Sequence, residues 1–186
     1  MKDKFVEMVS HLAKPGEDLM KEWNANKASL VHMLVGMYDE AQEVLCHDSR
    51  ENLIEEAGDF IFYLQGAAND LNITLDLSER DTPHKINYVS FFDNVYELLT
   101  QLKRHLFYNK PLPEKSALEE MFNKALDSVY CYVGHALKVH NSPAVSLEYI
   151  LSENYTKLML KRYPNGFSNE AANQRLDKQD INEVLR

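Results

Sequence analysis

Residues 30–72 decide the fold, and they read LVHMLVGMYDEAQEVLCHDSRENLIEEAGDFIFYLQGAANDLN. Apolar side chains recur along this stretch at steps of three and four residues, which is the spacing of one face of an α-helix. A short polar break after Cys46 divides the stretch into two helices. Because helices joined by a short loop lie antiparallel as neighbours, the stretch predicts a helical hairpin.

The rest of the chain continues the helical pattern. Its six glycines and six prolines fall almost wholly between apolar-periodic segments, and no alternating run is long enough to suggest a sheet. We therefore predict an all-α helical bundle of about six helices in a single domain, residues 1–186. The helices are expected at about 4–13, 17–46, 49–71, 87–107, 116–140 and 143–162, with a polar linker over 72–86 and a polar tail after Tyr163-Pro164-Asn165-Gly166.

Three of these helices carry start signals in the sequence. A hydroxyl or carboxylate side chain at the N-cap, with an acid three residues later, satisfies the unpaired amides of the first turn. Proline is also favoured at the first helical position. The expected starts are Asp48 with Glu51, Ser116 with Glu119, and Ser142 with Pro143.

The order long helix, short loop, helix occurs twice, at residues 17–71 and again at 87–140, which indicates an internal duplication. The C-terminal helix and tail, 143–186, complete the domain. When the two copies are aligned, the second copy has acids at two of the four positions and other residues at the remaining two. We therefore expect one working site, in the first half. Asp59 falls opposite Asp127, Glu43 opposite Glu97, Glu56 opposite Lys124, and Glu40 opposite Asn94.

The amino-acid composition excludes some classes of binding partner. With 29 acidic and 20 basic residues the net charge is -9, which repels polyanions, so no nucleic-acid partner is expected. The chain has no apolar run of membrane-spanning length and no signal peptide at its start, so we expect no membrane partner and a cytoplasmic location. Two cysteines, Cys46 and Cys131, are expected to be reduced structural thiols.

The candidate chemistry lies in two acidic pairs, Glu40-Ala-Gln-Glu43 and Glu56-Ala-Gly-Asp59. A spacing of three puts each pair on one helix face, with side chains about 5 to 6 Å apart, and the hairpin can bring all four together. Crowded carboxylates repel one another unless a divalent cation with an oxygen shell neutralises them. Gly58 permits close helix approach beside Asp59. From spacing alone, a solvated acidic helix face is the more ordinary interpretation.

Residues 30–72 resemble the core of the MazG-like all-α nucleoside triphosphate pyrophosphatases, relatives of the dimeric dUTPases, whose signature is two such acidic pairs on adjacent helices. The stretch ENYTKLMLKRYPNGFSNEAANQRLDK, residues 153–178, looks like the end of phage-encoded members. The stretch QLKRHLFYNKPL, residues 101–112, also looks like the family element that follows its first acidic pair. Its place in the second half supports duplication.

The resemblance implies an enzyme that cleaves a (d)NTP to the (d)NMP and pyrophosphate with Mg²⁺, for which Mn²⁺ can substitute. It implies that Glu40, Glu43, Glu56 and Asp59 are the metal-binding and catalytic residues. We expect Glu43 to orient the attacking water. It further implies a homo-oligomer, a dimer or tetramer, in the host cytoplasm if the gene belongs to a phage.

The resemblance also implies that Asn154, Lys157 and Arg162 contact phosphate oxygens. The residue types fit, because a triphosphate needs cations and amide donors beyond its metal ions, although Lys157 and Arg162 equally suit a solvated helix end. His32 and Tyr63 are expected beside the base. They lie near the acids in sequence and offer stacking and hydrogen bonds.

Two other functions compete with this prediction. The dipeptide His47-Asp48 is the one that an HD-type phosphohydrolase requires, but here it falls in a predicted loop instead of a helix. A non-enzymatic helical module that binds a partner would need only solvated acids. The products that the protein forms from nucleotides would distinguish the pyrophosphatase, the HD-type enzyme and the non-enzymatic module.

Overall fold

The computed structural model describes residues 1–79 and 88–178, and within these ranges it is all helix and loop, with no strand. The predicted all-α class is therefore confirmed. The α-helices are α1 Lys2–Leu12, α2 Gly16–Glu22, α3 Ala25–Leu45, α4 Arg50–Asp70, α5 Tyr88–Tyr108, α6 Lys115–Val139, α7 Leu147–Tyr155 and α8 Asn169–Gln174. A π-helical segment, η1 Thr156–Arg162, continues α7, and a 3₁₀ turn, η2 Leu176–Lys178, follows α8.

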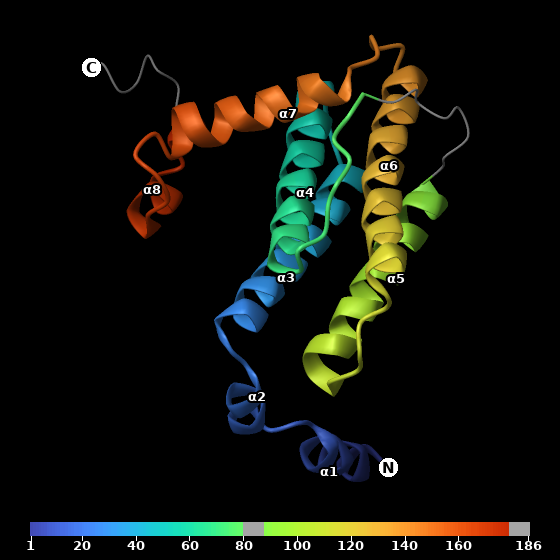
Figure 1. Cartoon of the computed structure of the whole chain (residues 1–186), viewed down its shortest axis with the longest axis vertical. Helices are drawn as coiled ribbons and strands as arrows, with labels where there is room; N and C mark the ends of the chain where they lie inside the picture. The colour runs from blue at the N-terminus through green and yellow to red at the C-terminus, as the bar shows by residue number, and fades with distance from the viewer. Residues whose placement is uncertain (80–87, 179–186) are drawn as a thin grey trace.

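Four long helices, α3 to α6, form the bundle (Figure 1). Helices α3 and α4 pack along each other as the predicted hairpin, and α5 and α6 form a second one. Aromatic rings join the two hairpins, because Phe91 of α5 lies 5.8 Å from Phe60 of α4 and 5.5 Å from Tyr132 of α6, measured between ring centroids. Both phenylalanines are completely buried. Two hairpins are what a duplication requires, and the duplication itself stays a prediction.

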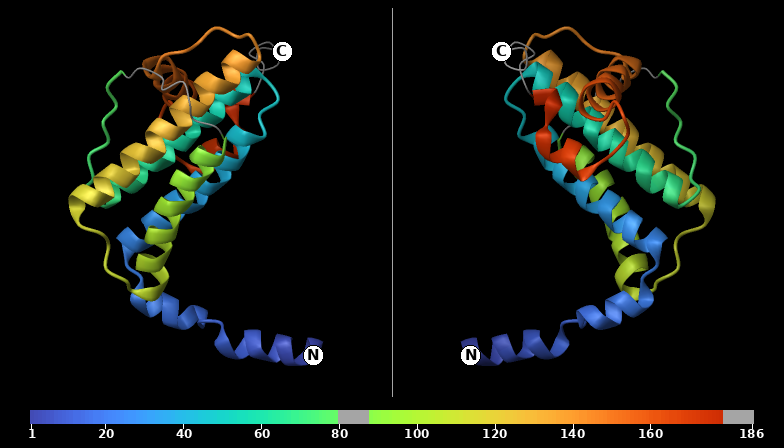
Figure 2. Two further views of the ribbon diagram at one scale, coloured as in Figure 1. Left: turned by 90° about the vertical axis from the view of Figure 1, so that its right-hand side faces the viewer. Right: turned by 90° about the vertical axis from the view of Figure 1, so that its left-hand side faces the viewer.

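Helix α7 and its continuation η1 cross the bundle on α4 (Figures 1 and 2). The predicted start at Ser142 with Pro143 is wrong. Residues 142–146 are irregular, and Ser146 is the N-cap, its hydroxyl accepting a hydrogen bond from the Tyr149 amide at 3.0 Å. The reason is tertiary: Val145 packs against the core and its carbonyl accepts a hydrogen bond from the Tyr130 hydroxyl, so the chain crosses the end of α6 before it turns into a helix.

Other predicted helix ends also shift. The single helix at 17–46 is broken between Glu22 and Ala25, because Trp23 adopts an extended conformation and its ring packs 5.6 Å from that of Phe107. Asn24 then caps α3. The cap of α4 is Ser49 in place of Asp48. Helix α6 begins one residue before Ser116, at Lys115, with no side-chain cap.

The described part of the predicted linker, residues 72–79, is an extended segment fastened to α6. Asn123 accepts a hydrogen bond from the Asp76 amide at 2.9 Å, and Ile73 and Leu75 are buried. The segment is thus part of the packed structure instead of a solvated linker. The remainder of that linker, the expected helix start at 87 and the tail from 179 onward lie outside the described residues.

The N-terminal helices extend from the bundle as an arm (Figure 2). Its base is held by the Lys14–Glu22 ion pair at 2.6 Å and by a hydrogen bond from Asn109 to Glu22 at 3.0 Å. Helix α1 itself is exposed on all its described positions, including Phe5 at 60% and Leu12 at 70%. None of the described helices is long and apolar enough to cross a membrane.

Candidate metal and nucleotide site

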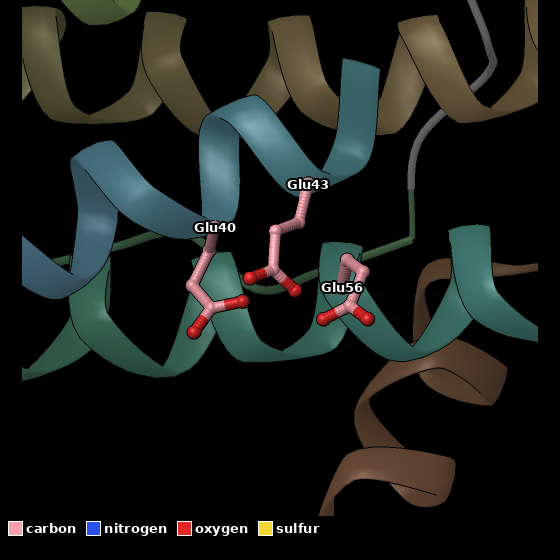
Figure 3. A group of neighbouring side chains, drawn as sticks. All are labelled: Glu40, Glu43 and Glu56. Carbon is pink, nitrogen blue, oxygen red and sulfur yellow. The ribbon is translucent and has the colours of Figure 1, made fainter. Parts of the chain in front are cut away.

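Three carboxylates from the first hairpin converge. Glu40 and Glu43 lie one turn apart on α3, and Glu56 faces them from α4 (Figure 3). One oxygen atom from each of the three lies within 4.8 Å of the others. Glu56 is buried, Glu40 is half-buried and Glu43 is exposed, so the cluster opens to solvent on the Glu43 side. An all-oxygen donor set of this kind suits a hard cation such as Mg²⁺.

The charges in this cluster are poorly compensated. Burial, together with the negative charges of Asp59, Glu56 and Glu43, raises the pKa of Glu40 to about 8. Burial and the neighbouring acids also raise the pKa of Glu56, although Asn52 donates a hydrogen bond to it at 2.6 Å. The Oε2 atom of Glu40 is buried and has no hydrogen-bond partner within residues 1–79 and 88–178. The donor set and the unpartnered oxygen both fit a bound divalent cation.

Asp59 lies beside the three glutamates but is engaged elsewhere. Asn154 of α7 donates a hydrogen bond to its Oδ1 at 2.6 Å, and the Lys157 ammonium of η1 contacts its Oδ2. Lys157 also reaches Glu55 Oε1 at 3.2 Å. The structure thus brings three of the four predicted acids to one point. The fourth acid, Asp59, is instead bound by Asn154 and Lys157, two of the three residues predicted to contact phosphate.

Gly58 lets α7 approach α4 this closely. A Cβ atom at position 58 would lie 2.8 Å from the Cβ and 3.1 Å from the Nδ2 of Asn154. No real Cβ contact is that short, and the Asn154 Cβ is attached directly to the backbone of α7. The glycine therefore sets the helix spacing on which the bond from Asn154 to Asp59 depends, as its place beside Asp59 suggested.

The substitution Gly58→Ala should displace α7 and weaken the bond between Asn154 and Asp59. Overpacking costs about 1–3 kcal/mol, against which the better helix propensity of alanine returns about 1 kcal/mol. We expect a modest loss of stability in urea unfolding, and a loss of about tenfold in any activity that depends on the position of Asn154. Gly16→Ala is the matched control, since nothing lies within 4 Å of a Cβ there. Wild-type activity and stability in Gly58→Ala would show that α7 is not held in this way.

Of the remaining predicted substrate residues, Tyr63 lies beside the acids, His32 packs against Tyr63, and Arg162 is bound elsewhere. Tyr63 of α4 is close enough to Glu40 and Asp59 that burial and their charges raise its pKa. The ring of His32 stands edge-on to that of Tyr63, with centroids 5.8 Å apart. Arg162, the third predicted phosphate contact, is bound to Asp177 instead, through its Nε and Nη2 atoms at 2.6 and 2.5 Å.

A cavity of about 200 Å³ shares Asn154 and Lys157 with the site, and sequence reasoning missed most of its residues. Glu55 could have been found, because it lies four residues before Asp59 on the same helix face. Asp177 and Lys178 carry no local signal, since their partners are distant in sequence. The polar lining consists of Arg50, Glu51, Glu55, Tyr149, Glu153, Asn154, Thr156, Lys157, Lys161, Asp177 and Lys178.

The dipeptide His47-Asp48 lies in the loop between α3 and α4, as the sequence predicts. His47 Nδ1 is 2.8 Å from the Val44 carbonyl oxygen, and its ring stands edge-on to that of His140, with the centroids 5.9 Å apart. Within the described ranges, the one group of three or more His, Cys, Asp or Glu side chains placed to share an ion is the glutamate cluster. The geometry therefore favours the acids over an HD-type centre.

Comparison of the chain with protein-family models, with curated proteins and with solved structures finds no match. The MazG-like resemblance accordingly stays a prediction. The features of the structure that indicate a function are the carboxylates, their raised pKa values and the polar groups that α7 and η1 bring to them.

Proposed function

We propose that the protein is a Mg²⁺-dependent nucleoside triphosphate pyrophosphohydrolase that converts a (d)NTP to the (d)NMP and pyrophosphate. The observation that carries the proposal is the convergence of Glu40, Glu43 and Glu56 within 4.8 Å, with one buried oxygen unpartnered within the described chain. A cation-binding acid cluster beside a lysine and an asparagine suits a polyphosphate, which needs both metal and hydrogen-bond donors.

In this proposal the three glutamates have different roles. Glu40, Glu43 and Glu56 would hold Mg²⁺ or Mn²⁺, which supplies charge neutralisation and polarisation of the phosphate oxygens when bound. Glu43, the exposed member, orients a water toward the α-phosphorus and accepts its proton. The new P–O bond forms as the bond to pyrophosphate breaks. No covalent nucleophile is needed.

Lys157 and Asn154 would supply the hydrogen-bond donors that the phosphate chain needs beyond the metal. Both already lie against Asp59, so they are positioned at the edge of the acid cluster before substrate arrives. Tyr63 and His32, with their edge-on rings, offer an aromatic surface for the base.

The test is a panel of canonical and modified (d)NTPs with Mg²⁺ or Mn²⁺, with products separated by chromatography. We expect monophosphate and pyrophosphate in equal amounts, and no turnover in EDTA. Release of triphosphate or orthophosphate would instead favour an HD-type enzyme. Absence of turnover with every nucleotide would favour a non-enzymatic helical module.

We also propose that the protein works as a homo-oligomer, a dimer or tetramer. The support is helix α1, where Phe5, Met8, Val9 and Leu12 are spaced three and four residues apart and are all exposed. A helix with such an unpartnered apolar stripe gains stability by packing against another surface. The arm projects away from its own bundle, which leaves the stripe open to a second copy (Figure 2).

Deleting residues 1–13 should therefore lower the oligomeric order measured by size-exclusion chromatography with light scattering. The bundle should remain folded, because α1 contributes nothing to the buried core. The double substitution Phe5→Ser and Leu12→Ser should have the same effect with the full-length chain. An unchanged mass in both variants would contradict a role for α1 in assembly.

A further inference from the structure

One ion pair binds the C-terminal turn η2 to the predicted phosphate-contacting segment η1, and a second binds it to α4. Asp177 receives hydrogen bonds from Arg162 Nε at 2.6 Å and Nη2 at 2.5 Å. Its side chain is only 1% exposed, and that of Arg162 is 13% exposed. One residue further on, Lys178 donates to Glu55 Oε1 at 2.6 Å. The turn thus holds partners on both η1 and α4.

The bond between Arg162 and Asp177 has the form that an arginine uses for phosphate. A guanidinium presents two parallel N–H groups that suit two oxygens of a carboxylate or of a phosphate equally well. A carboxylate held in this way occupies the position of an oxyanion ligand. Arg162 also lies near the acid cluster, because its charge and that of Glu40 both act on the Tyr63 hydroxyl.

Lys157 shows the same arrangement five residues earlier on η1. Its ammonium is bound by Asp59 and Glu55, and Glu55 is shared with Lys178. Both cations of η1 that we assign to the phosphates are therefore satisfied by the protein's own carboxylates. They can bind a polyphosphate only by exchanging those partners.

We propose that η2, Leu176–Lys178, is an internal latch in which Asp177 occupies Arg162 as a substitute for phosphate until the polyphosphate chain of the nucleotide displaces it. This inference rests on the proposed function. Displacement is eased by the backbone that leads into the turn. Arg175 has φ 47° and ψ 49°, a left-handed conformation that costs a residue with a side chain about 1 kcal/mol or more.

The latch predicts a gain of affinity on mutation. In Asp177→Asn the competing charge is gone, so inorganic tripolyphosphate, measured by calorimetry in EDTA, should bind about tenfold more tightly than to the wild type. KM for the best nucleotide should fall in parallel. Glu170→Gln is the matched control, because it removes the same charge from an exposed position of α8 and should leave both values unchanged.

A double-mutant comparison identifies Arg162 as the partner. Arg162→Gln should weaken tripolyphosphate binding, and adding Asp177→Asn to it should have no further effect. Unchanged or weaker binding in folded Asp177→Asn would overturn the latch and make this ion pair purely structural. If that variant does not fold, the chain ending at Arg175 carries the same test with the same expected tightening.

The two proposals fail separately. Wild-type hydrolysis to monophosphate and pyrophosphate, with no gain of affinity in Asp177→Asn, would reject the latch and keep the enzyme. Tighter tripolyphosphate binding in Asp177→Asn, with no hydrolysis of any nucleotide by the wild type, would keep the latch and reject the pyrophosphohydrolase.

Discussion

Glu56→Gln is expected to lower kcat/KM for the preferred nucleotide by about a thousandfold or more, because it removes one of the three converging carboxylates that we propose as metal ligands. The substitution keeps the shape of the side chain. Its amide oxygen can still accept the hydrogen bond that Asn52 donates to Glu56 at 2.6 Å. A steady-state assay with Mg²⁺ measures the loss, and circular dichroism checks the fold.

The same variant should be at least as stable as the wild type when no metal is present. Glu56 is buried among Glu43, Glu55 and Asp59, and this environment raises its pKa, which means that its charged form is disfavoured in the folded state. Removing the charge removes that cost. A protein that melts at the same or a higher temperature in EDTA, yet is inactive, is the signature of a functional acid and not of a structural one.

Glu97→Gln is the matched control. Glu97 is an exposed acid on α5, and the duplication aligns it with Glu43 in a half of the chain that we expect to hold no working site. Its activity and melting temperature should equal those of the wild type. Full activity in a folded Glu56→Gln variant would remove the site assignment, while a loss in Glu97→Gln would place function in the second half.

The first hairpin could be predicted from sequence because every signal for it is local. The three- and four-residue periodicity fixes the buried faces of α3 and α4, and the loop of four residues between Leu45 and Arg50 leaves few ways to pack them. The convergence of Glu40, Glu43 and Glu56 follows from these two facts. Gly58 was informative for the same reason, as a small residue next to an acid on a buried face.

What could not be predicted depends on partners distant in the chain. Asp59 was expected to share the metal site, but Lys157, 98 residues away, lies against it. Arg162 was expected at the phosphates, and Asp177 of the tail turn holds it. Local spacing says that a side chain is charged and on which face it lies. It does not say which of several opposite charges will reach it.

Helix starts were missed for a related reason. Ser142 followed by Pro143 is a good cap by local chemistry. The helix nevertheless begins at Leu147, because the Val145 carbonyl accepts a hydrogen bond from Tyr130 and holds the preceding residues in an irregular path. Likewise, the chain breaks at Trp23 because its ring finds Phe107, a residue 84 positions later. Packing against the bundle outweighs a cap, which contributes only about 1 kcal/mol.

Addition of Mg²⁺ is expected to raise the melting temperature by an amount that grows with pH. Glu40 has an ordinary pKa of 4.5, and in the folded protein burial and its acidic neighbours raise it to about 8. The folded state therefore binds this proton more tightly than the unfolded state does. The stability that comes from Glu40 is fully present below about pH 4.5 and is lost as the pH rises toward 8.

Without metal, the free energy of unfolding should accordingly fall by roughly 2 kcal/mol between pH 5 and pH 8 from Glu40 alone, after allowance for solvent screening. A bound metal ion makes the ionised form of Glu40 the favoured one in the folded state, because the cation binds the ionised carboxylate and must displace the proton. At a Mg²⁺ concentration a hundred times its Kd, the gain is about 2.7 kcal/mol, or roughly 5–10 °C in Tm. That gain should be small at pH 6 and full at pH 8.5.

Thermal melts at pH 6 and 8.5, each with EDTA and with Mg²⁺, decide between a metal centre and a solvated acidic face. Glu40→Gln should flatten the metal-free slope and abolish the Mg²⁺ shift, since it removes both the titrating group and a ligand. An exposed acidic face would give a small shift that is the same at both pH values and disappears in high salt. Only a buried, converging set couples proton loss to cation binding in this way, so a pH-independent shift would contradict the site that the rest of the mechanism requires.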